Sequence, residues 1–98
     1  MSRFEEVMRV IRENRELMEK RFGVKEIGLF GSVARGEETP LSDLDILVEF
    51  EEGAKGFDNY MDLKFFLEEK TGFRVDLILK TALKEQLRPF VLQEVVYA

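Results

Sequence analysis

The sequence contains no cysteine and no histidine, and only two prolines. Without cysteine, the chain can form neither a disulfide bond nor a thiolate metal site. The absence of histidine removes the side chain that most often serves as a general base and as a zinc ligand. Any catalysis by this chain must therefore depend on carboxylates and a hard metal ion.

Long hydrophobic runs and an excess of positive charge are also missing. No run of 18 apolar residues and no apolar N-terminal signal region occur, so we expect no membrane association and a cytoplasmic location. The net charge is −5, which disfavours nucleic acid as a partner, although a local basic patch stays open. A length of 98 residues is typical of one domain, so residues 1–98 are predicted to form a single domain.

The two ends of the chain have helical character. Apolar residues recur at helical spacing from Met1 to Phe22, which predicts one amphipathic helix with Ser2 as its N-cap. Residues 82–97 are also predicted to be helical, with a break near Arg88 because Pro89 cannot continue a helix. The last residues of this segment are very apolar, and any part left exposed would indicate a partner site.

The middle of the chain alternates between strands and helices. Apolar runs predict three strands, and a second amphipathic pattern predicts a helix ending at a Thr-Gly cap; these cover residues 24–30, 44–50 and 73–79 for the strands and 57–70 for the helix. The resulting order predicts an α+β (mixed α/β) fold, in which helices flank a mixed sheet of three or more strands.

Two carboxylates lie at the start of the second predicted strand. Asp43 and Asp45 precede the apolar run 46–48, and side chains two residues apart on a strand share a face, with Cα atoms roughly 6.6 Å apart. Such close carboxylates resist joint ionisation unless a cation lies between them, and Mg²⁺ prefers oxygen ligands of this kind. The alternative is structural, since a Ser-Asp pair is common in turns.

A glycine and a serine follow the first predicted strand. Gly31 allows the backbone to approach a ligand closely, and Ser32 offers a hydroxyl at the start of a short helical segment. Free N–H groups at such a start attract phosphate. A simple strand-ending turn is the alternative for this Gly-Ser pair.

These residues resemble the signature of the polymerase-beta-type nucleotidyltransferase superfamily. The similarity is carried by Phe30-Gly31-Ser32 and, after ten intervening residues, Asp43-Leu44-Asp45-Ile46. Arg35, Gly36 and Ser42 extend it to the minimal nucleotidyltransferase (MNT) branch, whose pattern is Gly-Ser-x-Ala-Arg-Gly followed by Ser-Asp-x-Asp. The superfamily requires a third carboxylate on a later strand, and Asp76 in Val75-Asp76-Leu77 has that position.

The resemblance implies a role for each site residue. Asp43, Asp45 and Asp76 would be the catalytic residues and the ligands of two Mg²⁺ ions, with Asp76 touching only the ion on the nucleophile's side. The nucleotide-binding residues would be Gly31, Ser32, Arg35 and Ser42: the first two hold phosphates, Arg35 neutralises triphosphate or fixes Asp43, and Ser42 steadies the Asp43 loop. For Asp76 alone, pairing with Arg74 is the structural alternative.

The resemblance also implies a reaction and a partner. An MNT protein of this size transfers AMP from ATP to a tyrosine hydroxyl of a cognate toxin of the HEPN (higher-eukaryote-and-prokaryote nucleotide-binding) family, and acts as its antitoxin. Two alternatives are an antitoxin or regulator that binds nucleotide and acts by contact alone, and a transferase whose small-molecule or RNA hydroxyl is presented by a partner subunit. The oligomeric state stays open, including a homo-oligomer.

Overall fold

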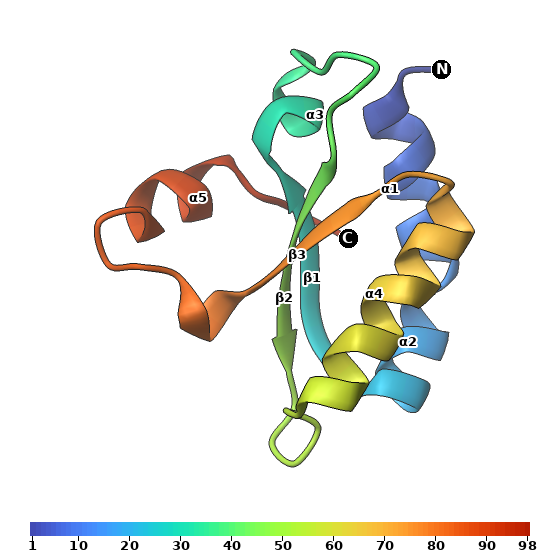
Figure 1. Ribbon diagram of the computed structural model, residues 1–98, viewed down its shortest axis with the longest axis vertical. Helices are drawn as coiled ribbons and strands as arrows, with labels where there is room; N and C mark the ends of the chain where they lie inside the picture. Colours follow the sequence, from blue (N-terminus) through green and yellow to red (C-terminus); the bar gives the residue numbers. More distant parts are fainter.

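The computed structural model describes residues 1–98, and its centre is a four-stranded mixed sheet (Figure 1). The strand order is β3-β2-β1-β4. Strand β1 pairs antiparallel with β2 and β4, whereas β2 and β3 run parallel. The strands are β1 (Val24–Phe30), β2 (Leu44–Phe50), β3 (Val75–Leu79) and β4 (Val96–Tyr97). This sheet confirms the predicted α+β class, and the bounds of β1 and β2 agree with the predicted ones.

Three helices cover one face of the sheet and build the core (Figure 1). They are α1 (Arg3–Glu13), α2 (Arg15–Phe22) and α4 (Phe57–Thr71). Residues 44, 46, 48 and 50 of β2 are buried in this core. Because strand side chains alternate, Asp45, Leu47 and Glu49 face the other side of the sheet. We refer to that side as the open face.

The N-terminal helix is divided in two, which corrects the prediction of one helix over Met1–Phe22. The break is at Asn14, whose side-chain amide donates to the carbonyl of Val10 at 2.8 Å. Asparagine competes with the helical backbone in this way, so it favours helix ends. The caps were predicted correctly: the Ser2 hydroxyl accepts from the Glu5 N–H, and Gly23 ends α2 in the left-handed region.

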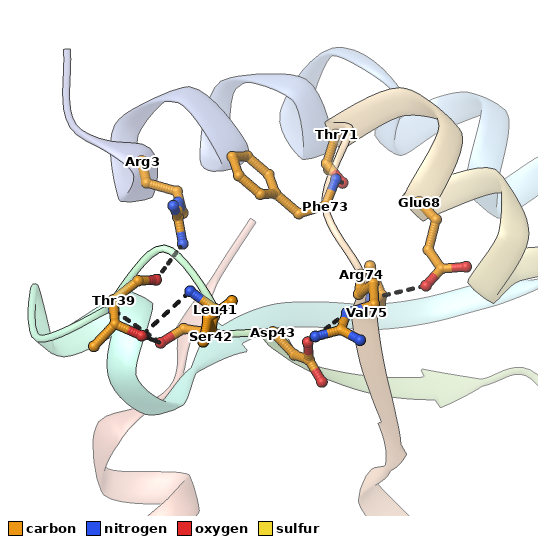
Figure 2. A network of polar contacts seen from close by, with 10 residues as sticks. All are labelled: Arg3, Thr39, Leu41, Ser42, Asp43, Glu68, Thr71, Phe73, Arg74 and Val75. Carbon is orange, nitrogen blue, oxygen red and sulfur yellow. Dashed lines mark hydrogen bonds and ion pairs between the residues drawn. The ribbon is translucent and has the colours of Figure 1, made fainter.

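The third strand begins later than predicted, at Val75 instead of residue 73. The N–H of Phe73 bonds to the hydroxyl of Thr71, and the Phe73 ring lies under the Arg3 guanidinium at 4.4 Å (Figure 2). These contacts hold Phe73 in the turn after α4, so the ladder with β2 starts two residues further on.

The C-terminal segment differs most from the predicted interrupted helix over 82–97. A 3₁₀ turn, η1 (Lys80–Ala82), is followed by a loop and then by α5 (Arg88–Glu94). Pro89 lies in the first turn of α5, where its missing N–H costs nothing, so it begins a helix and does not interrupt one. Val96 and Tyr97 then form β4 beside β1, as β-branched and aromatic residues favour. Figure 1 shows α5 on the open face.

None of the helices combines the length and the apolar character that crossing a membrane requires.

Candidate active site

Two of the three predicted carboxylates are direct neighbours on the open face. Asp45 of β2 is in register with Asp76 of parallel strand β3, and with Phe30 of β1 on its other side. Neighbouring strands lie about 4.8 Å apart, and the residues that follow the two acids, Ile46 and Leu77, are buried on the opposite face. Asp45 and Asp76 therefore project side by side from the same face.

The third carboxylate is held elsewhere. Asp43 lies one residue before β2, and its Oδ1 is 3.2 Å from Nε of Arg74 (Figure 2). Arg74 thus pairs with Asp43 and not with Asp76, the partner that the structural alternative proposed. In this arrangement no three acidic side chains form a preorganised metal-binding group.

Asp45 lies in an environment that raises the pKa of its carboxyl group. Partial burial raises the pKa of Asp45, and the negative charges of Asp76 and Asp43 raise it further, while Arg35 acts in the opposite direction. The ionised form of Asp45 is therefore disfavoured. A divalent cation would relieve this repulsion, and carboxylate oxygens suit a hard ion such as Mg²⁺. The donor set fits such an ion at Asp45 and Asp76, with Asp43 available once it leaves Arg74.

Gly31 joins β1 to α3 (Gly31–Arg35) directly beside Asp45. Its φ is +79°, and a Cβ atom built on it would overlap the carboxylate of Asp45. Only glycine fits here, because the backbone is left-handed and the Asp45 side chain packs against the Cα atom. The acid and the Gly-Ser turn are thus brought into contact, as the motif predicts for a site that joins them.

The other predicted nucleotide-binding residues lie near this turn or in the loop that follows it. Ser32 is the second residue of α3, and its hydroxyl forms no hydrogen bond within the chain. The hydroxyl of Ser42 accepts from the N–H of Thr39 at 2.9 Å and so closes the turn that precedes Asp43 (Figure 2). Arg35 lies at the end of α3, where Nε is 2.9 Å from Oε1 of Glu37.

Glu94, at the end of α5, is a site residue that the sequence did not indicate. One carboxylate oxygen accepts from the Gly31 N–H at 2.9 Å, and the other is 2.6 Å from the Arg35 guanidinium. Partial burial alone raises the pKa of Glu94, but the hydrogen bonds from Arg35 and Gly31 outweigh it and leave the pKa below its usual value. No local pattern could reveal this contact, because Glu94 lies far along the chain from both partners.

Two cavities flank this region, and the side chains of Phe30 and Val91 line both of them. The first, of about 430 Å³, is also lined by Gly31, Arg35 and Glu94. The second, of about 290 Å³, contains Asp45 and Asp76 and is otherwise largely apolar. The largest cavity of the chain, about 540 Å³ around Phe50 and Tyr60, contains no acidic residue. The candidate site therefore corresponds to the two cavities that Gly31, Asp45 and Asp76 line.

Comparison with known proteins agrees with this geometry. The family model for the nucleotidyltransferase domain matches residues 11–98. The chain is 43% identical over 97 residues to the protein adenylyltransferase MntA of Thermococcus cleftensis, covering 99% of this chain and 97% of that protein. The chain belongs to the minimal nucleotidyltransferases.

Solved structures show how closely this minimal nucleotidyltransferase follows its relatives. A structure described as a candidate minimal nucleotidyltransferase is 41% identical, with a TM-score of 0.80, and the match covers 98% of this chain and 95% of that one. A toxin–antitoxin complex with AMP-PNP is 21% identical with a TM-score of 0.67, over 96% of this chain and 70% of that one. The similarity to the toxin–antitoxin complex shows only that the two proteins share a fold.

Proposed function

We propose that this minimal nucleotidyltransferase transfers AMP from ATP to a tyrosine hydroxyl of a HEPN-type toxin and thereby acts as its antitoxin. The observation that carries the proposal is the pair Asp45 and Asp76, side by side on the open face, with Asp45 in contact with Gly31. The name of the 43% identical relative, a protein adenylyltransferase, supports the choice of AMP as the transferred group. Proteins of the same fold have been solved as MNT antitoxins in complex with a HEPN toxin.

The chain's own residues divide the work between the two cavities. Gly31 and Arg35, which line the first cavity, would hold the β- and γ-phosphates together with the neighbouring Ser32. The Gly31 N–H group and the Arg35 guanidinium would supply hydrogen bonds and positive charge. Asp45 and Asp76 would hold Mg²⁺, together with Asp43 after it separates from Arg74. When bound, Mg²⁺ neutralises charge on the triphosphate and makes the acceptor hydroxyl easier to deprotonate.

The reaction is an in-line displacement at the α-phosphorus. The acceptor oxygen forms a bond to this phosphorus, the bond to the bridging oxygen of the β-phosphate breaks, and pyrophosphate leaves. Asp76 faces the second cavity and receives the hydroxyl proton. Positioning and charge neutralisation supply most of the catalysis in such a transfer, so a site without histidine is sufficient.

The second cavity suits a tyrosine side chain as the acceptor. Its walls are mostly apolar, with Phe30, Leu83 and Leu87 among them, and Asp45, Asp76 and Lys84 are its charged residues. A tyrosine combines an apolar ring with a polar hydroxyl, so its ring can pack on these walls while the oxygen reaches the carboxylates. An RNA hydroxyl would bring phosphates toward a chain with a net charge of −5, which is unfavourable.

A labelling experiment tests the proposal. The chain is incubated with the purified partner toxin, Mg²⁺ and α-³²P-labelled ATP, and the labelled residue is identified by mass spectrometry. Label on a partner tyrosine is the expected result. A stable complex without label would indicate an antitoxin that acts by contact, and label on RNA or on a small molecule would indicate a different acceptor. A partner variant with phenylalanine in place of the modified tyrosine serves as the control.

A further inference from the structure

Glu94 binds the hydrogen-bond donors that the triphosphate of the nucleotide would need. Its two carboxylate oxygens bind the Gly31 N–H at 2.9 Å and the Arg35 guanidinium at 2.6 Å. These partners lie on the turn and the short helix that follow β1, whereas Glu94 comes from α5 on the opposite side of the first cavity. A carboxylate and a phosphate group each present two negatively charged oxygens that accept hydrogen bonds. One group can therefore replace the other on the same donors.

The contact lies in one cavity and joins two segments that are far apart in the sequence. Glu94 is only 25% exposed, and it lines the cavity together with Gly31 and Arg35. A second acid, Glu37, also binds Arg35 but through Nε, and it does not reach the Gly31 N–H. Arg35 is therefore neutralised twice, while the Gly31 N–H is blocked by Glu94 alone.

Moving Glu94 away requires little disruption of the core. No residue of α5 is buried, and Phe90 is 71% exposed. The other polar link of this helix is the Arg88 guanidinium, which donates to the carbonyl of Lys80 at 3.1 Å. Because β4 holds the residues just after Glu94 against β1, the helix end stays in place, and the Glu94 carboxylate leaves its donors by rotation of its own side chain. A ligand that binds the same donors more strongly can therefore displace it without loss of packed apolar surface.

We propose that Glu94 is an internal competitor of the nucleotide's triphosphate, which holds the Gly31 N–H and Arg35 until the nucleotide displaces it. This inference rests on the proposed function, because it assumes that the first cavity receives phosphates. Glu94 thus sets the nucleotide affinity of the chain: nucleotide binding includes the release of one charged contact. A variant that weakens this contact binds nucleotide more tightly.

Calorimetric titration of the full chain tests the inference with two probes, MgATP and Mg-tripolyphosphate. Glu94→Gln keeps the shape of the side chain but removes its charge, so we expect the Kd for both probes to fall about tenfold, which corresponds to about 1.4 kcal/mol. Equal tightening for both probes is expected because the contact concerns phosphate and not the nucleoside. Glu94→Ala, which removes the carboxyl group altogether, should tighten binding at least as much.

Glu37→Gln is the matched control, since it removes an equal charge from the same guanidinium and leaves the Gly31 N–H occupied. A smaller effect for Glu37→Gln than for Glu94→Gln is expected. Unchanged or weaker binding by both Glu94 variants would overturn the inference and show that Glu94 supports the site instead. Tightening for MgATP alone would overturn it too.

The two proposals fail in different ways. If the wild-type chain labels the toxin while the Glu94 variants bind no more tightly, the transfer proposal stands and the competitor role is wrong. If the Glu94 variants bind both probes more tightly but no acceptor becomes labelled, the competitor role stands and the transfer proposal is wrong.

Discussion

Arg74 holds Asp43 at 3.2 Å, just before the two parallel strands that carry Asp45 and Asp76 begin. One acid of the motif is thereby paired, while the other two stand side by side. The pKa of Asp45 is raised by its partial burial and then by the charges of Asp76 and Asp43, and the three acids form no ready metal-binding group. In the proposed mechanism Asp45 and Asp76 would hold Mg²⁺, and Asp43 would join them only after it separates from Arg74.

Replacement of Arg74 tests whether its ion pair keeps Asp43 from binding a cation. Arg74→Gln frees Asp43, so we expect Mg²⁺ affinity to rise by up to about fivefold, because an exposed ion pair is worth at most about 1 kcal/mol. Stability should change by less than about 1 kcal/mol for the same reason. Competition of Mg²⁺ with Mn²⁺, followed by electron paramagnetic resonance, measures the affinity. Arg12→Gln, which removes an exposed arginine without an ion pair, is the control; equal affinity in both variants would exclude Asp43 as a ligand.

Asp45 is expected to be essential for transfer. Asp45→Asn keeps the size of the side chain but removes the charge that faces Asp76, so labelling of the partner should fall by at least about 100-fold, as loss of a central electrostatic group does. Circular dichroism should show an intact fold. Asp62→Asn on the exposed side of α4 is the matched control and should leave labelling unchanged. Near-normal labelling by Asp45→Asn would remove the basis of the proposed mechanism.

The raised pKa of Asp45 also predicts how stability depends on pH. The folded-state pKa lies above the ordinary value of 3.8, so the contribution of this group to stability is complete below pH 3.8 and is lost as the pH rises through the folded value. In the absence of divalent ions, Asp45→Asn should therefore be more stable than the wild type at neutral pH, and the difference should disappear below pH 3.8. Urea unfolding at both pH values measures it, and greater stability of the wild type at neutral pH would contradict the electrostatic account.

The local features of the fold could be predicted from the sequence. The limits of β1 and β2, the Ser2 cap and the left-handed glycine after α2 all follow from apolar periodicity and from residues with strong local preferences. The Gly-Ser turn, Asp43 and Asp45 were found from their short spacing along the chain, whereas Asp76, far from them in the sequence, was found through the resemblance to the nucleotidyltransferase superfamily. Their placement in space depends only on adjacent strands.

The contacts between distant segments could not be predicted. Glu94 meets Gly31 and Arg35 only because α5 returns over the open face, and β4 forms only because the last residues reach β1. Residues 90–97 are mostly apolar and show neither a clear helical nor a clear strand period. Their sequence is therefore compatible with a helix or with a strand. Arg74 was placed beside the wrong acid because strand alternation alone pairs it with Asp76, whereas β3 begins one residue after it.

Gly31 should be difficult to replace. A side chain at position 31 suffers both a left-handed backbone, with φ of +79°, and overlap with the Asp45 carboxylate. Gly53 has a similar φ of +86° with open space around it, so Gly53→Ala isolates the backbone cost of about 1–2 kcal/mol. We expect Gly31→Ala to destabilise the chain by about 1–3 kcal/mol more than Gly53→Ala, measured by urea unfolding. Equal losses would show that Asp45 does not pack against Gly31.

The exposed side of α5 is the expected contact with the partner toxin. Phe90 is 71% exposed beside the first cavity, and Leu87, at the second cavity, is 53% exposed, so an aromatic anchor lies next to the reaction site. Phe90→Ser should raise the Kd for the toxin at least about tenfold, as removal of an aromatic anchor does, without lowering stability. Phe65→Ser is the matched control, because Phe65 is 56% exposed on α4, on the opposite side of the sheet (Figure 1). Biolayer interferometry measures both affinities. If Phe65→Ser lost affinity and Phe90→Ser did not, the interface would lie on the face that α1, α2 and α4 cover, from which an acceptor tyrosine could not reach Asp76.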